Sequence, residues 1–135
     1  MSQEQNVEIA LAAAATFNRG DREAFIALWD EEAEFVPLRA QLEGEAYRGH
    51  EGLERFFAKQ AEQWGDSVRF EINESRAVGD EVVVGIGRFR ARGRASGVDL
   101  NVPLGVFIRV RNGKLVYLRL FTEPTDALEA AGLRE

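Results

Sequence analysis

Residues 98–121, "VDLNVPLGVFIRVRNGKLVYLRLF", contain the pattern that decides the fold. Asn112-Gly113 separates two alternating runs, and Asn-Gly in that position is typical of a tight β-hairpin. Successive side chains of a strand point to opposite faces, and here both faces of both runs are largely apolar. Because a solvated face would be polar, both faces of this hairpin need a cover. We expect helices to cover one face and a second copy of the chain to cover the other, which predicts a homodimer through the sheet.

The rest of the chain places helices before the strands. Helical periodicity predicts helices at residues 4–18, 22–29 and from near His50 to 64, with a short last helix at 126–131. The first two form an αα-hairpin, since only "NRGD" joins them. Alternation predicts strands at 33–38, 67–72 and 79–97 before the hairpin, and Pro37 restricts the first strand to an edge or a bulge. Helices followed by four long antiparallel strands indicate an α+β fold.

Composition narrows the class of protein. The 135 residues fit one domain, residues 1–135, and the net charge of −6 argues against binding to nucleic acid. With no cysteine and the single histidine His50, we expect no metal site, and we expect no cofactor. Glu4 and Glu8 flank the alanine-rich start and argue against a signal peptide, and no segment has the length of a membrane span. We therefore expect a soluble, cytoplasmic protein that does not contact membranes.

Several blocks, in this order and spacing, resemble the SnoaL-like group of the nuclear transport factor 2-like superfamily. They are "FNRGDREAFIALW", "YRGHEGLERFF", "GRASG", "VRNGKL" and "DALEAAGL". The resemblance covers nearly the whole chain. It implies a cone-shaped, curved antiparallel sheet, covered by the N-terminal helices, with a pocket between sheet and helices. It does not imply one function, because this scaffold carries isomerases, cyclases, dehydratases, epoxide hydrolases and non-catalytic adaptors.

The catalytic groups of the family's enzymes are absent from the matching positions. In the ketosteroid isomerase branch, the base, the two oxyanion donors and a supporting tyrosine correspond to Pro37, Ala13, Gly105 and Phe57. None of these can abstract a proton or stabilise an oxyanion. The segment "GVFIRV" lacks the His and Trp of many SnoaL-like relatives, and no carboxylate pair brackets an arginine as in the epoxide hydrolases. The sequence therefore assigns no catalytic residue.

Arg88, Arg90, Arg92 and Arg94 occupy every second position of one strand. On the resemblance, the side of the strand that carries them lines the cavity, together with Val82, Val84 and Ile86. Arg88 and Arg90 would then stand at the pocket mouth, where they suit a carboxylate or phosphate. Alternatively they are solvated, and for Arg92 and Arg94 we expect solvent and acidic neighbours.

Other candidates have a structural alternative. His50 could titrate, but we interpret it as a helix-start residue. The acidic run "WDEEAEF" is interpreted as a solvated helix end rather than a cation site. Glu123 and Arg119 could form an ion pair, perhaps across the dimer. Gly85 and Gly87 within a strand indicate either close packing or room for a ligand, and the sequence does not distinguish the two.

We expect the domain to bind a small hydrophobic molecule that carries an acidic or carbonyl group. The expected ligand-binding residues are Trp29, Phe35, Tyr47, Phe57, Trp64, Arg88, Arg90, Asn101 and Phe107. An enzyme would have a polar residue with a perturbed pKa deep in the pocket, acting as an isomerase, hydrolase or cyclase with non-standard residues. A non-catalytic dimerisation or interaction module would fill the pocket with its own side chains.

Overall fold

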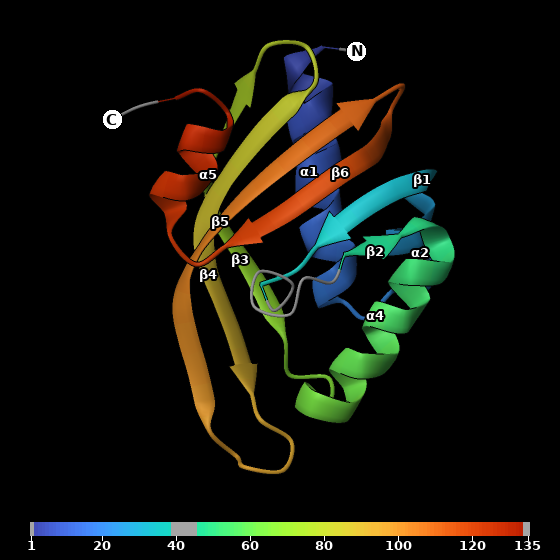
Figure 1. The fold of residues 1–135 in the computed structure, drawn as a ribbon, viewed down its shortest axis with the longest axis vertical. Helices are drawn as coiled ribbons and strands as arrows, with labels where there is room; N and C mark the ends of the chain where they lie inside the picture. Colours follow the sequence, from blue (N-terminus) through green and yellow to red (C-terminus); the bar gives the residue numbers. More distant parts are fainter. Residues whose placement is uncertain (1, 39–45, 134–135) are drawn as a thin grey trace.

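The computed structural model describes residues 2–38 and 46–133. Within these residues, four helices and a six-stranded sheet form one curved α+β body (Figure 1). The helices are α1 (Gln3–Asn18), α2 (Arg22–Ala27), α4 (Gly49–Trp64) and α5 (Pro124–Ala130). The strands are β1 (Trp29–Val36), β2 (Tyr47–Arg48), β3 (Arg69–Val78), β4 (Val82–Arg92), β5 (Asp99–Arg111) and β6 (Lys114–Phe121).

The strands are ordered β2-β1-β6-β5-β4-β3 in the sheet. All neighbours are antiparallel except β1 and β6, which run parallel. The long strands β3 to β6 follow one another in sequence and in space, as the alternation predicts. Asn112 and Gly113 both have positive φ, 52° and 77°, which confirms the tight hairpin between β5 and β6.

A local cap fixes the start of α1, and a long-range contact holds its end. Ser2 accepts a hydrogen bond from the Gln5 amide at 3.1 Å, and the Gln5 side chain accepts one from the Ser2 amide, which completes a capping box. At the other end the Asn18 side chain exchanges two hydrogen bonds with the Phe70 backbone, each 2.9 Å long. These bonds attach α1 to β3, so that the helix lies along one face of the sheet.

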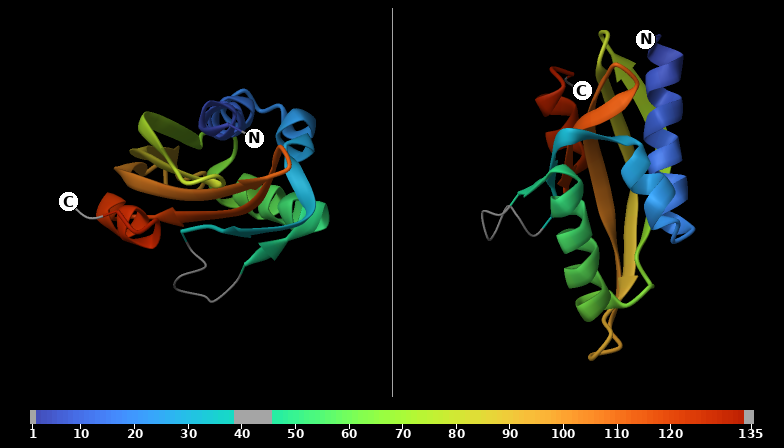
Figure 2. Two further views of the ribbon diagram at one scale, coloured as in Figure 1. Left: turned by 90° about the horizontal axis from the view of Figure 1, so that it is seen from above. Right: turned by 90° about the vertical axis from the view of Figure 1, so that its right-hand side faces the viewer.

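The helices are divided between the two faces of the sheet. Helix α1 lies along one face, and α5 packs on the opposite face (Figure 2). We call these the inner and the outer face. Ala127 and Leu128 of α5 are buried against Val84, Phe107 and Phe121 of the sheet. This contact covers part of the face for which the sequence predicted a second copy of the chain, so the apolar pattern there does not by itself require a dimer.

The largest difference from the sequence-based expectation concerns Trp29. Its spacing from Phe25 suggested that it ends the second helix, but α2 ends at Ala27 and Trp29 is the first residue of β1. Strand β1 also lies between β2 and β6 rather than at an edge, and its register with β6 shifts between Trp29 and Glu34. Pro37 follows the last residue of β1, so its missing amide costs the sheet no hydrogen bond.

None of the described helices has the length and apolar composition that crossing a bilayer requires.

Candidate functional site

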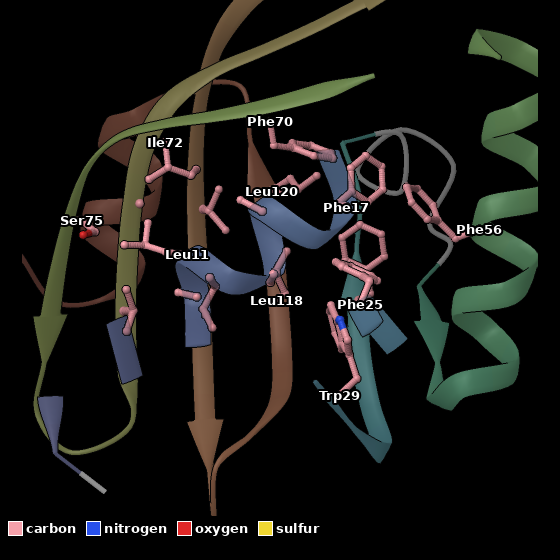
Figure 3. Close-up of a pocket in the computed structure, with 18 residues that line it drawn as sticks. Leu11, Phe17, Phe25, Trp29, Phe56, Phe70, Ile72, Ser75, Leu118 and Leu120 are labelled. Carbon is pink, nitrogen blue, oxygen red and sulfur yellow. The ribbon is translucent and has the colours of Figure 1, made fainter. Parts of the chain in front are cut away.

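The inner face encloses a small, almost wholly apolar cavity beneath α1, which we call the inner chamber (Figure 3). Its volume is about 60 Å³, roughly the liquid volume of two water molecules. Of the 18 described residues that line it, only Trp29 and Ser75 carry polar side-chain atoms. The chamber is therefore suited to an apolar group of few atoms.

Small residues on facing elements provide this space. The alanine run of α1 contributes Ala10, Ala13 and Ala14 to the wall, and Gly85 of β4 lies across from it. A longer side chain at any of these four positions would reduce the chamber.

Gly85 and Gly87 have different reasons to be glycine. A Cβ on Gly85 would lie 3.4 Å from Ile72 Cγ2 and 3.8 Å from Val106 Cβ, which is ordinary contact, so Gly85 leaves room in the chamber. A Cβ on Gly87 would overlap the carbonyl oxygen of Glu71, because β3 bulges between Ile72 and Glu74 and crowds β4. The sequence left two explanations open for these glycines. Gly85 leaves room in the chamber, and Gly87 is required by close packing against the backbone of β3.

Trp29 brings a buried hydrogen-bond donor to the wall of the chamber. The residue is 2% exposed, and its Nε1 is buried with no hydrogen-bond partner among the described residues. A buried donor left unsatisfied costs about 1–3 kcal/mol. Ring contacts hold the indole between Phe25 and Phe35, with centroid distances of 5.7 Å and 5.8 Å.

A second, wider cavity of about 330 Å³ lies between α4 and the sheet, and we call it the vestibule. It shares Phe56, Phe70 and Leu120 with the inner chamber, so the two cavities adjoin at these residues. Its other apolar lining comes from β4, β5 and α4 and from the segment after β1, including Phe89, Leu100, Val102, Trp64 and Leu38. Polar side chains occur along α4 and at the end of β6, namely Lys59, Gln60, Gln63 and Thr122. The vestibule is thus larger and more polar than the chamber.

Three arginines of this series, Arg88, Arg90 and Arg92, lie on the outer face of β4, away from both cavities. Val83, Gly85 and Phe89 of β4 line the cavities, whereas Val84 packs beneath α5. Because side chains alternate, Arg88 and Arg90 share the face of Val84. The expectation that they stand at the pocket mouth assumed the opposite orientation of β4, and it is wrong on this point.

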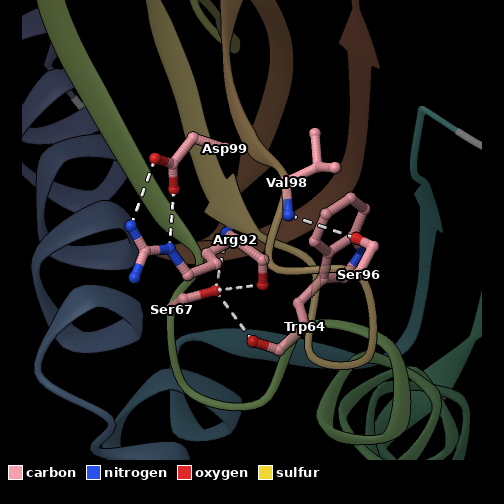
Figure 4. Close-up of polar contacts among 6 residues, drawn as sticks. All are labelled: Trp64, Ser67, Arg92, Ser96, Val98 and Asp99. Atoms are coloured by element: carbon pink, nitrogen blue, oxygen red, sulfur yellow. Dashed lines mark hydrogen bonds and ion pairs between the residues drawn. The ribbon is translucent and has the colours of Figure 1, made fainter.

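Neighbouring groups satisfy these arginines. Arg88 donates to the Asn101 side chain at 2.5 Å and to its carbonyl oxygen at 3.0 Å, and Arg90 lies 3.2 Å from the Glu71 carboxylate. Arg92 forms a two-pronged pair with Asp99 at 2.8 and 3.2 Å (Figure 4).

Arg94 differs from the other three because its partner is a helix. Its side chain donates to the carbonyl oxygen of Ala61 at 3.2 Å, near the C-terminus of α4, where a cation is favourable. Next to this contact, the Ser67 hydroxyl lies within hydrogen-bond distance of the carbonyl oxygens of Trp64 and Arg92 (Figure 4). The β4–β5 connection is therefore attached to the end of α4.

The fold and the cavities agree with the sequence comparisons. A family model described as a SnoaL-like domain matches residues 10–118. The chain belongs to the SnoaL-like family. No functionally curated protein matches it closely enough to count as a relative.

Solved structures with the same fold cover nearly the whole SnoaL-like domain. Bal32a, from a soil-derived mobile gene cassette, is 26% identical with a TM-score of 0.76, over 87% of this chain and 88% of that one. TerC, co-crystallised with polyporic acid, is 21% identical with a TM-score of 0.78, over 95% and 98%. A hypothetical protein from Catenulispora acidiphila with a ketosteroid isomerase-like fold, in complex with trimethylamine, is 18% identical with a TM-score of 0.74, over 94% of each chain. Members of this fold therefore bind small molecules.

The nine residues expected to bind ligand separate into three groups in this SnoaL-like domain. Trp29 and Phe35 line the inner chamber, and Tyr47 and Trp64 line the vestibule. Phe57 lies in the buried core beside Phe17, outside both cavities. The remaining four are on the outer face, and they are Arg88, Arg90, Asn101 and Phe107. The vestibule residues Phe89 and Val102 were missed because the opposite face of their strands was taken as the inner one.

His50 has a structural role, as the sequence suggested. Its Nε2 lies 2.8 Å from the carbonyl oxygen of Trp29 and donates to it, which joins the start of α4 to the start of β1. The acidic run after Trp29 lies in β1, so its interpretation as a helix end is wrong. The described residues contain no cluster of three or more metal-ligating side chains.

The clear pKa shifts occur at the surface. The hydrogen bond from Arg111 lowers the pKa of Glu81, and the hydrogen bond from Arg92 lowers the pKa of Asp99. Both pairs are exposed cross-strand contacts. Of the described residues that line the inner chamber, none is titratable.

Proposed function

We propose that this SnoaL-like domain binds a small, uncharged hydrophobic molecule, with one end in the inner chamber and the remainder in the vestibule. The observation that carries the proposal is the adjoining pair of cavities, in which the vestibule of about 330 Å³ meets the apolar chamber at Phe56, Phe70 and Leu120. Apolar lining with few polar groups is typical of ligand pockets, and the volume lies at the lower end of their usual range. A ligand of one or two rings suits this space.

The lining favours a neutral ligand over an anion. The chamber has no charged side chain among its described residues, and the arginines of β4 lie on the other face. A carboxylate buried in such surroundings would lose its hydration without gaining a cation. Lys59 is the charged residue in the described lining, and it lies in the vestibule.

The same lining favours binding over catalysis. General acid–base chemistry needs a titratable group within hydrogen-bond reach of the reacting atoms. In the described part of the cavities these groups are Tyr47 and Lys59, both in the vestibule, and neither stands where the family's enzymes have their catalytic groups. TerC with polyporic acid and the Catenulispora acidiphila protein with trimethylamine support small-molecule binding by this fold.

Thermal shift with three related compounds tests the proposal. The probes are 2-isopropenylnaphthalene and 2-acetylnaphthalene, which are neutral, and 2-naphthoate, which is anionic. A ligand at 100 times its Kd stabilises the folded state by about 2.7 kcal/mol. At roughly 3–5 °C per kcal/mol for a domain of this size, the midpoint should rise by about 10 °C with the neutral compounds. We expect a much smaller rise with 2-naphthoate.

A pair of matched substitutions locates the binding site. Thr122 is exposed and lines the vestibule, whereas Thr125 is exposed on α5 outside both cavities. Thr122→Trp should place an indole in the vestibule and abolish the shift, and Thr125→Trp should leave it as in the wild type. Equal shifts in the wild type and Thr122→Trp would contradict the proposal, as would the absence of a shift with every compound.

Dimerisation through the outer face is a separate proposal. Val82, Ile86 and Tyr117 are half-buried next to the α5 contact and would be covered further by a second copy. Light scattering after size exclusion should give twice the 15.1 kDa chain mass. A monomer at the highest soluble concentration would contradict it. A dimer in which no compound binds would favour the non-catalytic interaction module.

A further inference from the structure

We propose that Trp29 selects the ligand, by donating a hydrogen bond from its Nε1 to an uncharged carbonyl oxygen at the end that enters the inner chamber. The expected ligand class is therefore a small aromatic or alicyclic ketone, aldehyde or quinone. This inference rests on the proposed binding function and adds the chemical group that the chamber recognises.

The indole of Trp29 is held in place before any ligand arrives. The backbone carbonyl oxygen of Trp29 accepts the hydrogen bond from His50 at 2.8 Å. The backbone carbonyl oxygen of the preceding residue, Leu28, accepts one from the Leu115 amide at 2.9 Å. Phe25 and Phe35 contact the ring itself. A donor fixed in this way loses little conformational freedom on binding, so that most of the hydrogen-bond energy is retained in the affinity.

The part of the chain that the structure describes offers Nε1 no acceptor. Figure 3 shows the indole nitrogen facing the ring-lined end of the chamber, with Ser75 at the far end. Faces of the neighbouring phenylalanines are much weaker acceptors than an oxygen. A water molecule next to Nε1 would also be poorly held, because it needs two or more polar partners and this end of the chamber provides one.

The chemistry of an indole N–H limits what can bind. It donates and does not accept, so a protonated amine gains nothing from it. A carboxylate would receive one hydrogen bond and no opposite charge in the chamber. An uncharged carbonyl accepts the bond and brings no charge, which matches both the donor and the apolar wall.

Two pairs of isosteric compounds test the assignment. Acetophenone and 2-acetylnaphthalene are compared with isopropenylbenzene and 2-isopropenylnaphthalene, in which a methylene group replaces the carbonyl oxygen. A net hydrogen bond between neutral groups corresponds to an affinity ratio of about three- to tenfold. We expect the ketones to bind more tightly by this ratio in the wild type. Trp29→Phe should reduce the ratio to one, while Phe107→Leu, which alters a buried aromatic residue on the outer face, should retain it.

An NMR measurement on the wild type gives the answer even if Trp29→Phe fails to fold. The chain has two tryptophans, so Trp64→Phe identifies the indole N–H signal of Trp29. The ketones should move this proton downfield and slow its exchange with solvent, and the isopropenyl compounds should do neither.

Four results would overturn the inference. Equal affinity for ketone and isopropenyl compound, or a ratio that survives Trp29→Phe, would leave the binding function standing and remove Trp29 as the selecting group. An unchanged Trp29 signal with bound ketone would do the same. If none of the four compounds binds, the proposed function fails, and the role of Trp29 fails with it.

Discussion

Gly85→Ala and Gly87→Ala make the same chemical change two residues apart on one face of β4, and the structure predicts opposite effects on stability. At Gly85 the added methyl group meets side-chain carbons of Ile72 and Val106 at 3.4–3.8 Å. At Gly87 it meets backbone, with the Cα of Ile72 at 3.0 Å and the Glu71 carbonyl oxygen closer still. Side chains can adjust by a few tenths of an ångström, but the bulged backbone of β3 cannot yield without breaking its pairing with β4.

The magnitudes follow from these contacts. A methyl group buried at Gly85 contributes about 0.8 kcal/mol, and the smaller conformational freedom of alanine in the unfolded chain contributes about 0.4–1 kcal/mol. Gly85→Ala should therefore stabilise the domain by about 1–2 kcal/mol. Overpacking typically costs 1–3 kcal/mol, and because the obstacle here is backbone we expect about 3 kcal/mol for Gly87→Ala. The two variants should differ by roughly 4 kcal/mol.

Urea unfolding followed by circular dichroism measures this difference. With a slope of about 2 kcal/mol per molar urea, the midpoints of the two variants should lie roughly 2 M apart, on either side of the wild type. The reasoning is refuted if Gly87→Ala unfolds at the wild-type midpoint, or if Gly85→Ala is the less stable of the two. Since Gly85→Ala also narrows the inner chamber, it should weaken the binding of the naphthalene compounds while it stabilises the fold.

Three further predictions concern the scaffold around the cavities. Asn18→Ala removes both hydrogen bonds to the Phe70 backbone and should cost about 2 kcal/mol in urea unfolding; a loss below 0.5 kcal/mol would contradict a tethering role. Leu104→Ala empties a fully buried site on the inner face of β5 and should cost about 2–5 kcal/mol, so an unchanged thermal midpoint would be incompatible with this packing. Glu81 has a lowered pKa in the folded state, so its pairing with Arg111 stabilises the domain at neutral pH, and that contribution disappears as the pH falls through the lowered pKa. Arg111→Gln should raise the Glu81 pKa towards its ordinary value, as NMR titration would show, and should slightly weaken the loss of stability in acid; an unchanged pKa would exclude the pairing.

Several features could be predicted from the sequence because they depend on near neighbours. The end of α1 before Gly20 and the turn at Asn112-Gly113 each follow from a few adjacent residues. The order of the helices and long strands follows in the same way, and with the matching blocks it was sufficient to identify the family.

The orientation of β4 could not be predicted, because both of its faces are apolar. One face carries Val82, Val84 and Ile86, and the other carries Val83 and Phe89. Alternation defines these two faces, but it does not show which one faces the interior. The bulge in β3 and the docking of α5 decide this, and they place the arginines on the outer face. Arg88, Arg90, Asn101 and Phe107 were expected in the pocket and lie on the outer face because the sequence analysis took the wrong face of the sheet as the inner one.

The sequence alone thus determined the class of fold, the order of its elements and the family. The tertiary structure decided which face of the sheet forms the cavities, and that the buried Trp29 donor has no partner among the described residues. The physical reason is the distance along the chain between the residues that interact. Caps, turns and alternation are set by residues a few positions apart, whereas a cavity and an unsatisfied hydrogen bond depend on every side chain that surrounds them, from α1, β1, β3 and β6 at once.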